Sequence, residues 1–333
     1  MITTSNAQFT ALNEGNVPPL EQIRDRVWVI PLAMTGTSPL LRYTLTYLLA
    51  DDEGRLHVVD PGTGSDANWT SFWAAVRELP VSGEIGSIIV THMHADHLGL
   101  ASRLQEATGA PLMMHALEIE ALDAPEVDVL VHAAPWGVPE ERLPEIKAIR
   151  ALRQDAPPPP RPDAAFSGVL TTQQSNGLEL EILHTPGHTS GSICIRLPGE
   201  KLLLSGDHIL PMLYPGIGLG ATTERNPLAD YDASLSRVLG FDDHEVLPGH
   251  GYRFTGLADR IDRIRAHHQR RNAEVAGAIT RTPDASVYEV AAQLTWSRGW
   301  ENVRGVVLYS ALRQTSMHIG YIRTQDLASQ PAT

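Results

Sequence analysis

Short apolar runs separated by turn-forming residues characterise residues 1–255 of the chain. Runs of about four to eight apolar residues, bounded by glycine, proline, asparagine or aspartate, are typical of buried strands. They predict strands at 27–32, 43–50, 56–59, 86–90, 112–115, 178–183, 192–197, 201–204 and 245–247. Helical spacing predicts helices at 66–79, 97–107 and 228–240, after a loose lead-in at 1–20. We therefore expect a strand-rich sheet with helices laid against it.

The segment 116–175 interrupts this pattern. It contains a short helical stripe, formed by Ile146, Ile149 and Leu152, and then four consecutive prolines at 157–160. Proline runs end helices and stiffen loops, and a long insertion between two halves of a site often forms a lid or a pocket wall. We interpret the segment as an insertion that acts as a lid. The alternative is a surface excursion with no catalytic role.

The chain from about residue 258 onward has a purely helical pattern. Helical spacing continues from Ile261 to Ile279, Thr282-Pro283-Asp284-Ala285 has the form of a helix start, and a third helix is predicted at about 303–319. Three helices and a short wing would form a small satellite domain. We therefore divide the chain into residues 1–257 and residues 258–333.

The composition is that of an ordinary globular protein, with 42% hydrophobic and 20% charged residues. No apolar run approaches the roughly 20 residues that a membrane helix requires, and the N-terminus lacks the pattern of a secretory signal. The single cysteine, Cys194, excludes an internal disulfide and is expected to be a buried thiol. These features favour a cytoplasmic protein without a membrane partner.

The charge of the chain bears on its partners. A formal net charge of −13 argues against nucleic acid as the general partner. From residue 258 onward, however, ten arginines stand against seven acidic residues. We interpret arginines such as Arg260, Arg263, Arg270 and Arg271 as the solvated face of a helix, with a nucleic-acid patch as the alternative.

The densest group of candidate ligands is His92-x-His94-x-Asp96-His97, between the apolar run 88–90 and a predicted helix. Residues i and i+2 of an extended segment point the same way, so His92 and His94 can bind one ion together. The chain then turns, and Asp96 and His97 can face a second ion. Imidazole and carboxylate are ligands that zinc takes. This motif predicts half of a two-metal hydrolytic site.

The missing ligands follow later strands. His188, Asp207 and His250 each stand just past an apolar strand and beside a glycine, where a sheet edge would present them to one site. We assign one ion to His92, His94 and His188, the other to Asp96, His97 and His250, and place Asp207 between the two ions. Asp96 would also aim the attacking hydroxide and relay a proton to the leaving group.

In this order and context the motifs resemble those of the metallo-β-lactamase superfamily. The resemblance rests on the first motif, on His188 in Thr-Pro-Gly-His-Thr, on Asp207 in Ser-Gly-Asp-His and on His250 in Pro-Gly-His-Gly. It implies an α+β protein with an αββα sandwich and a dinuclear metal centre at one edge of the sheets. The C-terminal helices resemble, more loosely, the winged-helix-like domain of one branch of that superfamily.

From these observations we predict a metal-dependent hydrolase. It would use a metal-bound hydroxide at a dinuclear zinc site, with Mn²⁺ or Fe²⁺ as alternative ions, to cleave a thioester or lactone of a small molecule. Tyr214, after the Asp207 motif, and Trp136, in the insertion, are the predicted substrate contacts. The partner is a small-molecule substrate, and a homodimer is allowed. The alternatives are an RNA or phosphodiester hydrolase, a mononuclear iron dioxygenase acting on a persulfide, and a binding protein that retains metals without turnover.

Overall fold

A computed structural model describes residues 1–34, 41–124, 131, 133–147, 161–221, 223–297 and 299–329 of the chain. It consists of two compact units. The first, here called the sheet unit, comprises Met1–Asp123, Pro159–Ala221 and Asp230–Arg263. The second, the helical unit, comprises Ala124–Pro158, Thr222–Ala229 and Ile264–Thr333. Each unit is described by itself.

The sheet unit contains two seven-stranded sheets. The N-sheet has the order β2 (Glu21–Arg24), β3 (Val27–Ala33), β4 (Tyr43–Ala50), β5 (Leu56–Val59), β6 (Ile85–Ile89), β7 (Leu112–His115) and β8 (Ala164–Phe166). The C-sheet has the order β1 (Ile2–Thr3), β14 (Phe254–Thr255), β13 (Glu245–Pro248), β12 (Leu202–Gly206), β11 (Ile193–Leu197), β10 (Leu178–His184) and β9 (Leu170–Ser175).

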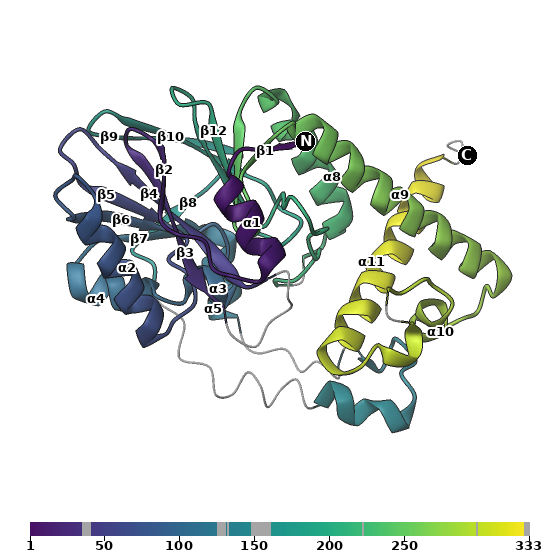
Figure 1. Ribbon diagram of the computed structural model, residues 1–333. Helices are drawn as coiled ribbons and strands as arrows, with labels where there is room; N and C mark the ends of the chain where they lie inside the picture. The colour runs from purple at the N-terminus through teal and green to yellow at the C-terminus, as the bar shows by residue number, and fades with distance from the viewer. Residues whose placement is uncertain are drawn as a thin grey trace. The chain divides into compact units, whose positions relative to one another are not determined.

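Strand β4 shows how the sequence pattern builds the layers. Its residues Leu45 and Leu49 point between the two sheets, where they join a core that includes Leu180 and Ile195 of the C-sheet. Leu48, on the opposite face, belongs to a second core under the helices α2 (Asp66–Glu78) and α4 (Ala101–Thr108). Because side chains alternate across a strand, one apolar strand fills both cores. The helices cover the outer face of the N-sheet (Figure 1).

The helix α8 (Pro227–Val238) packs on the loops that follow strands β10 and β12 of the C-sheet. Tyr231 is fully buried, and its hydroxyl donates to the carbonyl of His208 at 2.7 Å. The hydroxyl of Ser234 donates to the carbonyl of Pro186 at 2.8 Å. The mixed sheets and their helices confirm the predicted α+β class.

The structure corrects the prediction at the N-terminus, which is not a loose lead-in. Strand β1 pairs with β14, and the helix α1 (Asn6–Glu14) begins at Ser5, whose side chain accepts the N–H of Gln8. The N-cap satisfies one of the free N–H groups of the first helical turn. This segment is thus held in a regular structure by a partner strand about 250 residues away in the sequence and by the capping side chain of Ser5.

The predicted helix at 97–107 is two helices, α3 (Ala95–Leu98) and α4. The break falls at Gly99, where a Cβ atom would collide with the backbone of Gly64. The close approach of these two backbones determines where the chain bends. Gly64 belongs to the turn that follows β5, so the bend fixes α3 against the end of that strand.

The segment 116–175 contributes to both units. Its first residues form the helix α5 (Ala116–Asp123), and its last residues form β8, which pairs with β7, and β9, which pairs with β10. The described middle part, which includes the short helix η1 (Glu140–Arg142), belongs to the helical unit. Ile149, Leu152 and the prolines 157–160 lie outside the described residues. The role of a lid stays a prediction.

The helical unit is built on α9 (Leu257–Arg281, entering from the sheet unit), α10 (Val287–Ala292) and α11 (Gly305–Ser329). A capping box of Ser286 and Glu289 begins α10. Residues 264–297 and 299–329 contain helices and turns but no strand. The winged-helix-like character therefore stays a prediction. No helix among the described residues combines the length and apolar character that a membrane crossing requires.

Candidate metal centre

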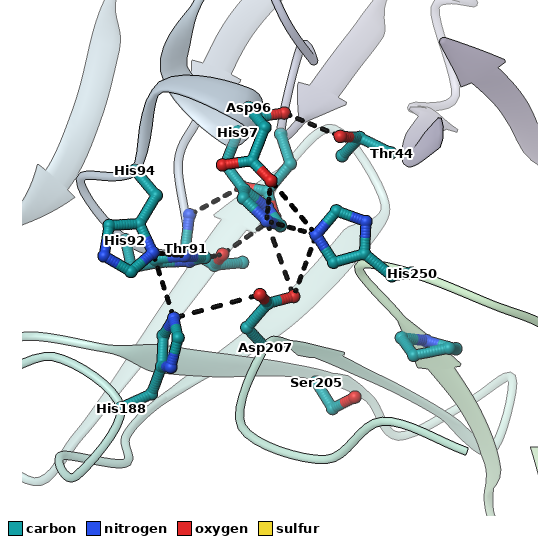
Figure 2. A network of polar contacts seen from close by, with 12 residues as sticks. Thr44, Thr91, His92, His94, Asp96, His97, His188, Ser205, Asp207 and His250 are labelled. Atoms are coloured by element: carbon teal, nitrogen blue, oxygen red, sulfur yellow. Dashed lines mark hydrogen bonds and ion pairs between the residues drawn. The ribbon is translucent and has the colours of Figure 1, made fainter. Parts of the chain in front are cut away.

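All seven predicted ligands converge at one edge of the sheet unit (Figure 2). His92 and His94 follow β6, and Asp96 and His97 lie in α3. His188 lies between β10 and β11, and Asp207 directly follows β12. The seventh residue, His250, follows β13. Their side-chain atoms form three overlapping groups with metal-ligand spacing: His92, His94 and His188; His92, His97 and Asp207; Asp96, His97 and His250.

The first triad consists of three imidazoles. The Nδ1 atom of His94 lies 3.0 Å from the Nε2 atom of His92 and 3.0 Å from the Nε2 atom of His188. The rings meet edge to face, at 82° and 89°. Nitrogens bound to one tetrahedral zinc ion at its usual bond length lie about 3.3 Å apart. The spacing of these nitrogens therefore matches one face of such a coordination shell.

The second triad combines two imidazoles with a carboxylate. The Nε2 atoms of His97 and His250 are 3.2 Å apart, and an oxygen of Asp96 lies 3.2 Å from Nε2 of His250. The backbone carbonyl of Asp96 accepts a hydrogen bond from the hydroxyl of Thr44 at 2.8 Å, which anchors α3 to β4. A second group with metal-ligand spacing thus lies directly beside the first.

Asp207 lies between the triads. Its Oδ2 atom faces Nε2 of His188 at 3.8 Å, and its Oδ1 atom faces Nε2 of His97 at 3.4 Å and Nε2 of His250 at 3.5 Å. Within the described part of the chain, the buried Oδ1 atom has no hydrogen-bond partner. Buried carboxylate oxygens without such partners are costly unless a cation compensates them. The carboxylate is therefore placed to contact ions on both sides.

The outer ring nitrogens of three ligands each face a backbone carbonyl. The acceptors are the oxygens of Gly216 for His188 (2.6 Å), Tyr43 for His250 (2.8 Å) and Leu219 for His94 (3.1 Å). Because a carbonyl only accepts, the outer nitrogen carries the proton, and the lone pair of the neutral ring is on the inner nitrogen. This is the arrangement that metal-binding histidines require. The residues present fit a pair of divalent cations.

A family model described as the Metallo-beta-lactamase superfamily matches residues 40–250 of the chain. The chain belongs to this superfamily. The matched range contains both sheets of the sheet unit in large part and all seven candidate ligands. Metallo-beta-lactamase superfamily members bind divalent metal ions in this fold, in agreement with the clusters of histidine and aspartate described above.

Individual proteins support the assignment. The chain is 28% identical over 210 residues to the hydroxyacylglutathione hydrolase GloC of Haemophilus influenzae, covering 61% of this chain and 84% of GloC. It is 27% identical over 215 residues to the acyl-coenzyme A thioesterase MBLAC2 of Gallus gallus, covering 63% and 72%. A crystal structure of a metallo-beta-lactamase family protein from Thermus thermophilus shares the fold, with a TM-score of 0.73, 24% identity and coverage of 92% and 95%. The chain is a hydrolase of this superfamily.

Asp60 also lies in the candidate metal centre of this superfamily member, although the sequence pattern did not reveal it. Its Oδ2 atom accepts from Nδ1 of His97 at 2.8 Å and from the hydroxyl of Thr91 at 2.7 Å, and its Oδ1 atom accepts from the N–H of Thr91 at 2.7 Å. Since the Thr91 hydroxyl donates to Asp60, it accepts from Nδ1 of His92 at 3.0 Å. Asp60 thus orients two imidazoles, one directly and one through Thr91.

The electrostatics of the first triad favour neutral rings. Burial, followed by the neighbouring rings of His97 and His94, lowers the pKa of His92 well below its ordinary value. Burial and the ring of His94 lower the pKa of His188 to about 4. Both rings are therefore neutral at pH 7, which is the form that binds a metal ion.

In the second triad the neighbouring carboxylates raise the pKa values of the rings instead. Burial disfavours the cation of His97, but the carboxylates of Asp207 and Asp60 outweigh it and raise the pKa of His97 well above its ordinary value. Burial also disfavours the cation of His250, yet Asp207 raises the pKa of this ring to about 9. Burial would raise the pKa of Asp207, but His250 and His97 lower it. The carboxylates thus favour positive charge at this group of residues, which a divalent metal ion would supply.

The predicted substrate contacts lie in different units. Tyr214 belongs to the sheet unit, in the loop after Asp207, and the residue is 40% exposed. Trp136 belongs to the helical unit, where it is buried in a core that includes Leu308 and packs against Tyr309 with ring centroids 5.5 Å apart. Both substrate roles stay predictions.

Two residues outside the candidate metal centre make contacts with backbone carbonyl groups. Arg260 is buried, so the interpretation of this arginine as part of a solvated helix face is wrong. Its Nε atom donates to the carbonyl of Leu210 at 2.7 Å. This arginine is buried because the loop after Asp207 folds over the start of α9 and presents carbonyl groups to it.

His184 contacts its own loop: its Nε2 atom lies 2.9 Å from the carbonyl of Ser190.

Proposed function

We propose that this protein is a thioester hydrolase that binds two divalent metal ions, with zinc as the leading candidate. His92, His94 and His188 would hold one ion, and Asp96, His97 and His250 would hold the other. Asp207 would contact both. The observation that carries the proposal is the position of the Asp207 carboxylate between two triads whose histidine nitrogens are spaced as ligands.

Bound ions would supply a nucleophile at neutral pH by lowering the pKa of water, and would polarise the carbonyl of the substrate. The chain itself supplies the orientation. Asp60 and the backbone carbonyls described above fix the rings, so little reorganisation is needed when charge develops. The site is at the edge of rigid sheets, which favours precise positioning.

Asp96 is the candidate for proton transfer. Its side chain is 24% exposed, compared with 11% for Asp207 and 2% for His250. Hydrolysis of a thioester adds the hydroxyl of water to the acyl carbon and returns a proton to the departing sulfur. A partly accessible carboxylate at this position can hold that proton between the two events.

Two observations support a thioester as the substrate class. The relatives GloC and MBLAC2 carry the names hydroxyacylglutathione hydrolase and acyl-coenzyme A thioesterase. In addition, the loop after Asp207 exposes two apolar side chains, Met212 at 46% and Tyr214 at 40%. The hydroxyl of Tyr252, two residues past His250, contacts the sulfur of Met212 at 3.3 Å. This apolar loop beside the centre would contact the acyl group.

The test is a substrate panel with metal-loaded protein. We expect turnover of acyl-coenzyme A or acyl-glutathione thioesters that exceeds turnover of lactones, phosphodiesters and β-lactams. Asp96→Asn should lower kcat at least about 100-fold, the lower end of the range for general acid–base groups. The control is Asp262→Asn, which changes an exposed carboxylate on α9. Wild-type kcat in Asp96→Asn, or preferred cleavage of a phosphodiester, would contradict the proposal.

A further inference from the structure

Glu118 is a buried carboxylate that contacts both loops of the first triad. It lies in α5 with 0% exposure. Its Oε2 atom accepts the N–H of Met93 at 2.7 Å, and its Oε1 atom accepts the N–H of Gly191 at 2.6 Å. Met93 stands between His92 and His94, and Gly191 follows His188 by three positions. One side chain therefore joins the loop after β6 to the loop between β10 and β11.

The contact with the second loop depends on a glycine. A Cβ atom added to Gly191 would lie 2.7 Å from the backbone nitrogen of Glu118, 2.8 Å from its Cγ atom and 2.9 Å from its Oε1 atom. The loop backbone and the carboxylate are thus in direct contact, and no other residue type leaves room for this approach. Next to this contact, the N–H of Ile193, the first residue of β11, donates to the carbonyl of Thr91 in the loop after β6 at 3.0 Å.

The chemistry of these two bonds argues for a positional role. A buried carboxylate is costly unless it is well hydrogen-bonded, and bonds from N–H groups to an ionised acceptor are shorter and stronger than neutral ones. Only a carboxylate offers an acceptor oxygen to each of two N–H groups that face it from opposite loops. A neutral amide would satisfy one of them and oppose the other with its own N–H.

We propose that Glu118 is a positioning residue that sets the distance between the loops of His94 and His188. It thereby sets the affinity of the first triad for its cation. Glu118 would not bind the ion itself, and the second triad would not depend on it, because Asp96, His97 and His250 are held by Thr44, Asp60 and Tyr43. The identity of the ligand as a divalent cation rests on the proposed function.

The first test is amide hydrogen exchange in metal-free protein, which needs no activity. In Glu118→Gln, at least one of the Met93 and Gly191 amides should exchange at least about tenfold faster than in the wild-type protein, because the amide that faces the new NH₂ group loses its acceptor. Glu120→Gln, an exposed residue on the same helix, should leave both rates unchanged. Wild-type protection of both amides in Glu118→Gln would overturn the proposal.

The second test resolves the two ions. Zinc occupancy is measured by anomalous diffraction of crystals equilibrated at limiting zinc. Glu118→Gln should weaken binding at the first triad about 10- to 100-fold, as is typical for partners of metal ligands, and leave the second triad occupied as in the wild-type protein. Equal loss at both positions, or loss at neither, would overturn the proposal.

The same contact can be removed from the opposite loop, in case Glu118→Gln does not fold. Gly191→Ala should reproduce the faster exchange and the selective loss of zinc. Gly199→Ala is its control, since a Cβ atom there meets nothing within 4 Å. Wild-type exchange and zinc binding in Gly191→Ala would contradict the proposal. If the wild-type protein binds no zinc at all, the proposed function fails, and the exchange rates alone decide the role of Glu118.

Discussion

At the residue scale, the centre depends on side chains that are not ligands. Asp60 is the best example. It adopts a left-handed backbone conformation, with φ of +53°, which is uncommon for residues other than glycine, asparagine and aspartate. This conformation turns its carboxylate back toward His97 and Thr91. A carboxylate on the outer nitrogen of a metal-binding histidine fixes the tautomer and makes the ring more basic.

Asp60→Asn tests this role with little change in shape. Asparagine also tolerates the left-handed conformation, so the turn should persist while His97 loses its charged acceptor. We expect zinc affinity, measured by competition with a chelator, to fall about 10- to 100-fold. Asp262→Asn should bind zinc as the wild-type protein does. Unchanged affinity in Asp60→Asn would show that the carboxylate does not support the centre.

The convergence of the seven candidate ligands could be predicted, but their partners could not. Closely spaced histidines after a strand, and single ligands beside glycines after later strands, leave a local pattern. Asp60 and Glu118 are single acidic residues whose contacts lie tens of positions away in the sequence. For Asp60 one signal existed: it directly follows the strand 56–59, at the edge where the other site residues gather. For Glu118 the sequence contains no comparable signal.

At the element scale, parallel strand pairs explain why the ligands meet. β5 and β6 are parallel neighbours in the N-sheet, and β12 and β13 are parallel neighbours in the C-sheet. The carboxyl ends of parallel neighbours lie at the same edge, which is where α/β sheets bind ligands. The apolar runs predicted these strands well. They did not reveal β9, a polar edge strand that is defined by its pairing with β10.

Gly206→Ala tests how closely the two sheet edges must approach. Gly206, the last residue of β12, has φ of +47°, and a Cβ atom there would lie 2.6 Å from the hydroxyl oxygen and 2.9 Å from the Cβ atom of Thr91. The substitution should displace Asp207 from the triads and lower kcat at least about tenfold, because small misplacements are costly in catalysis. Gly240→Ala, where a Cβ atom meets nothing within 4 Å, is the control. Wild-type kcat in Gly206→Ala would mean that this approach is not required.

At the scale of the whole molecule, residues that are neighbours in the sequence do not always belong to the same compact unit. The sheet unit is assembled from three separate segments, and the helical unit from three others. Periodicity could identify the C-terminal helices. It could not show that residues near 133–147 pack with them, because that contact joins Ala133 and Ile146 to Val303 and Leu312, more than 150 positions away. Long-range packing of this kind has no local pattern in the sequence.

Seven side chains, from segments far apart in the sequence, would hold two cations, with Asp207 between them. The most direct measurement is anomalous diffraction at the zinc edge from crystals of the wild-type protein loaded with zinc. We predict two peaks, about 3.5–4 Å apart as in other two-metal sites, one at each triad. A single peak, or none, in the presence of excess zinc would contradict a centre that holds two cations.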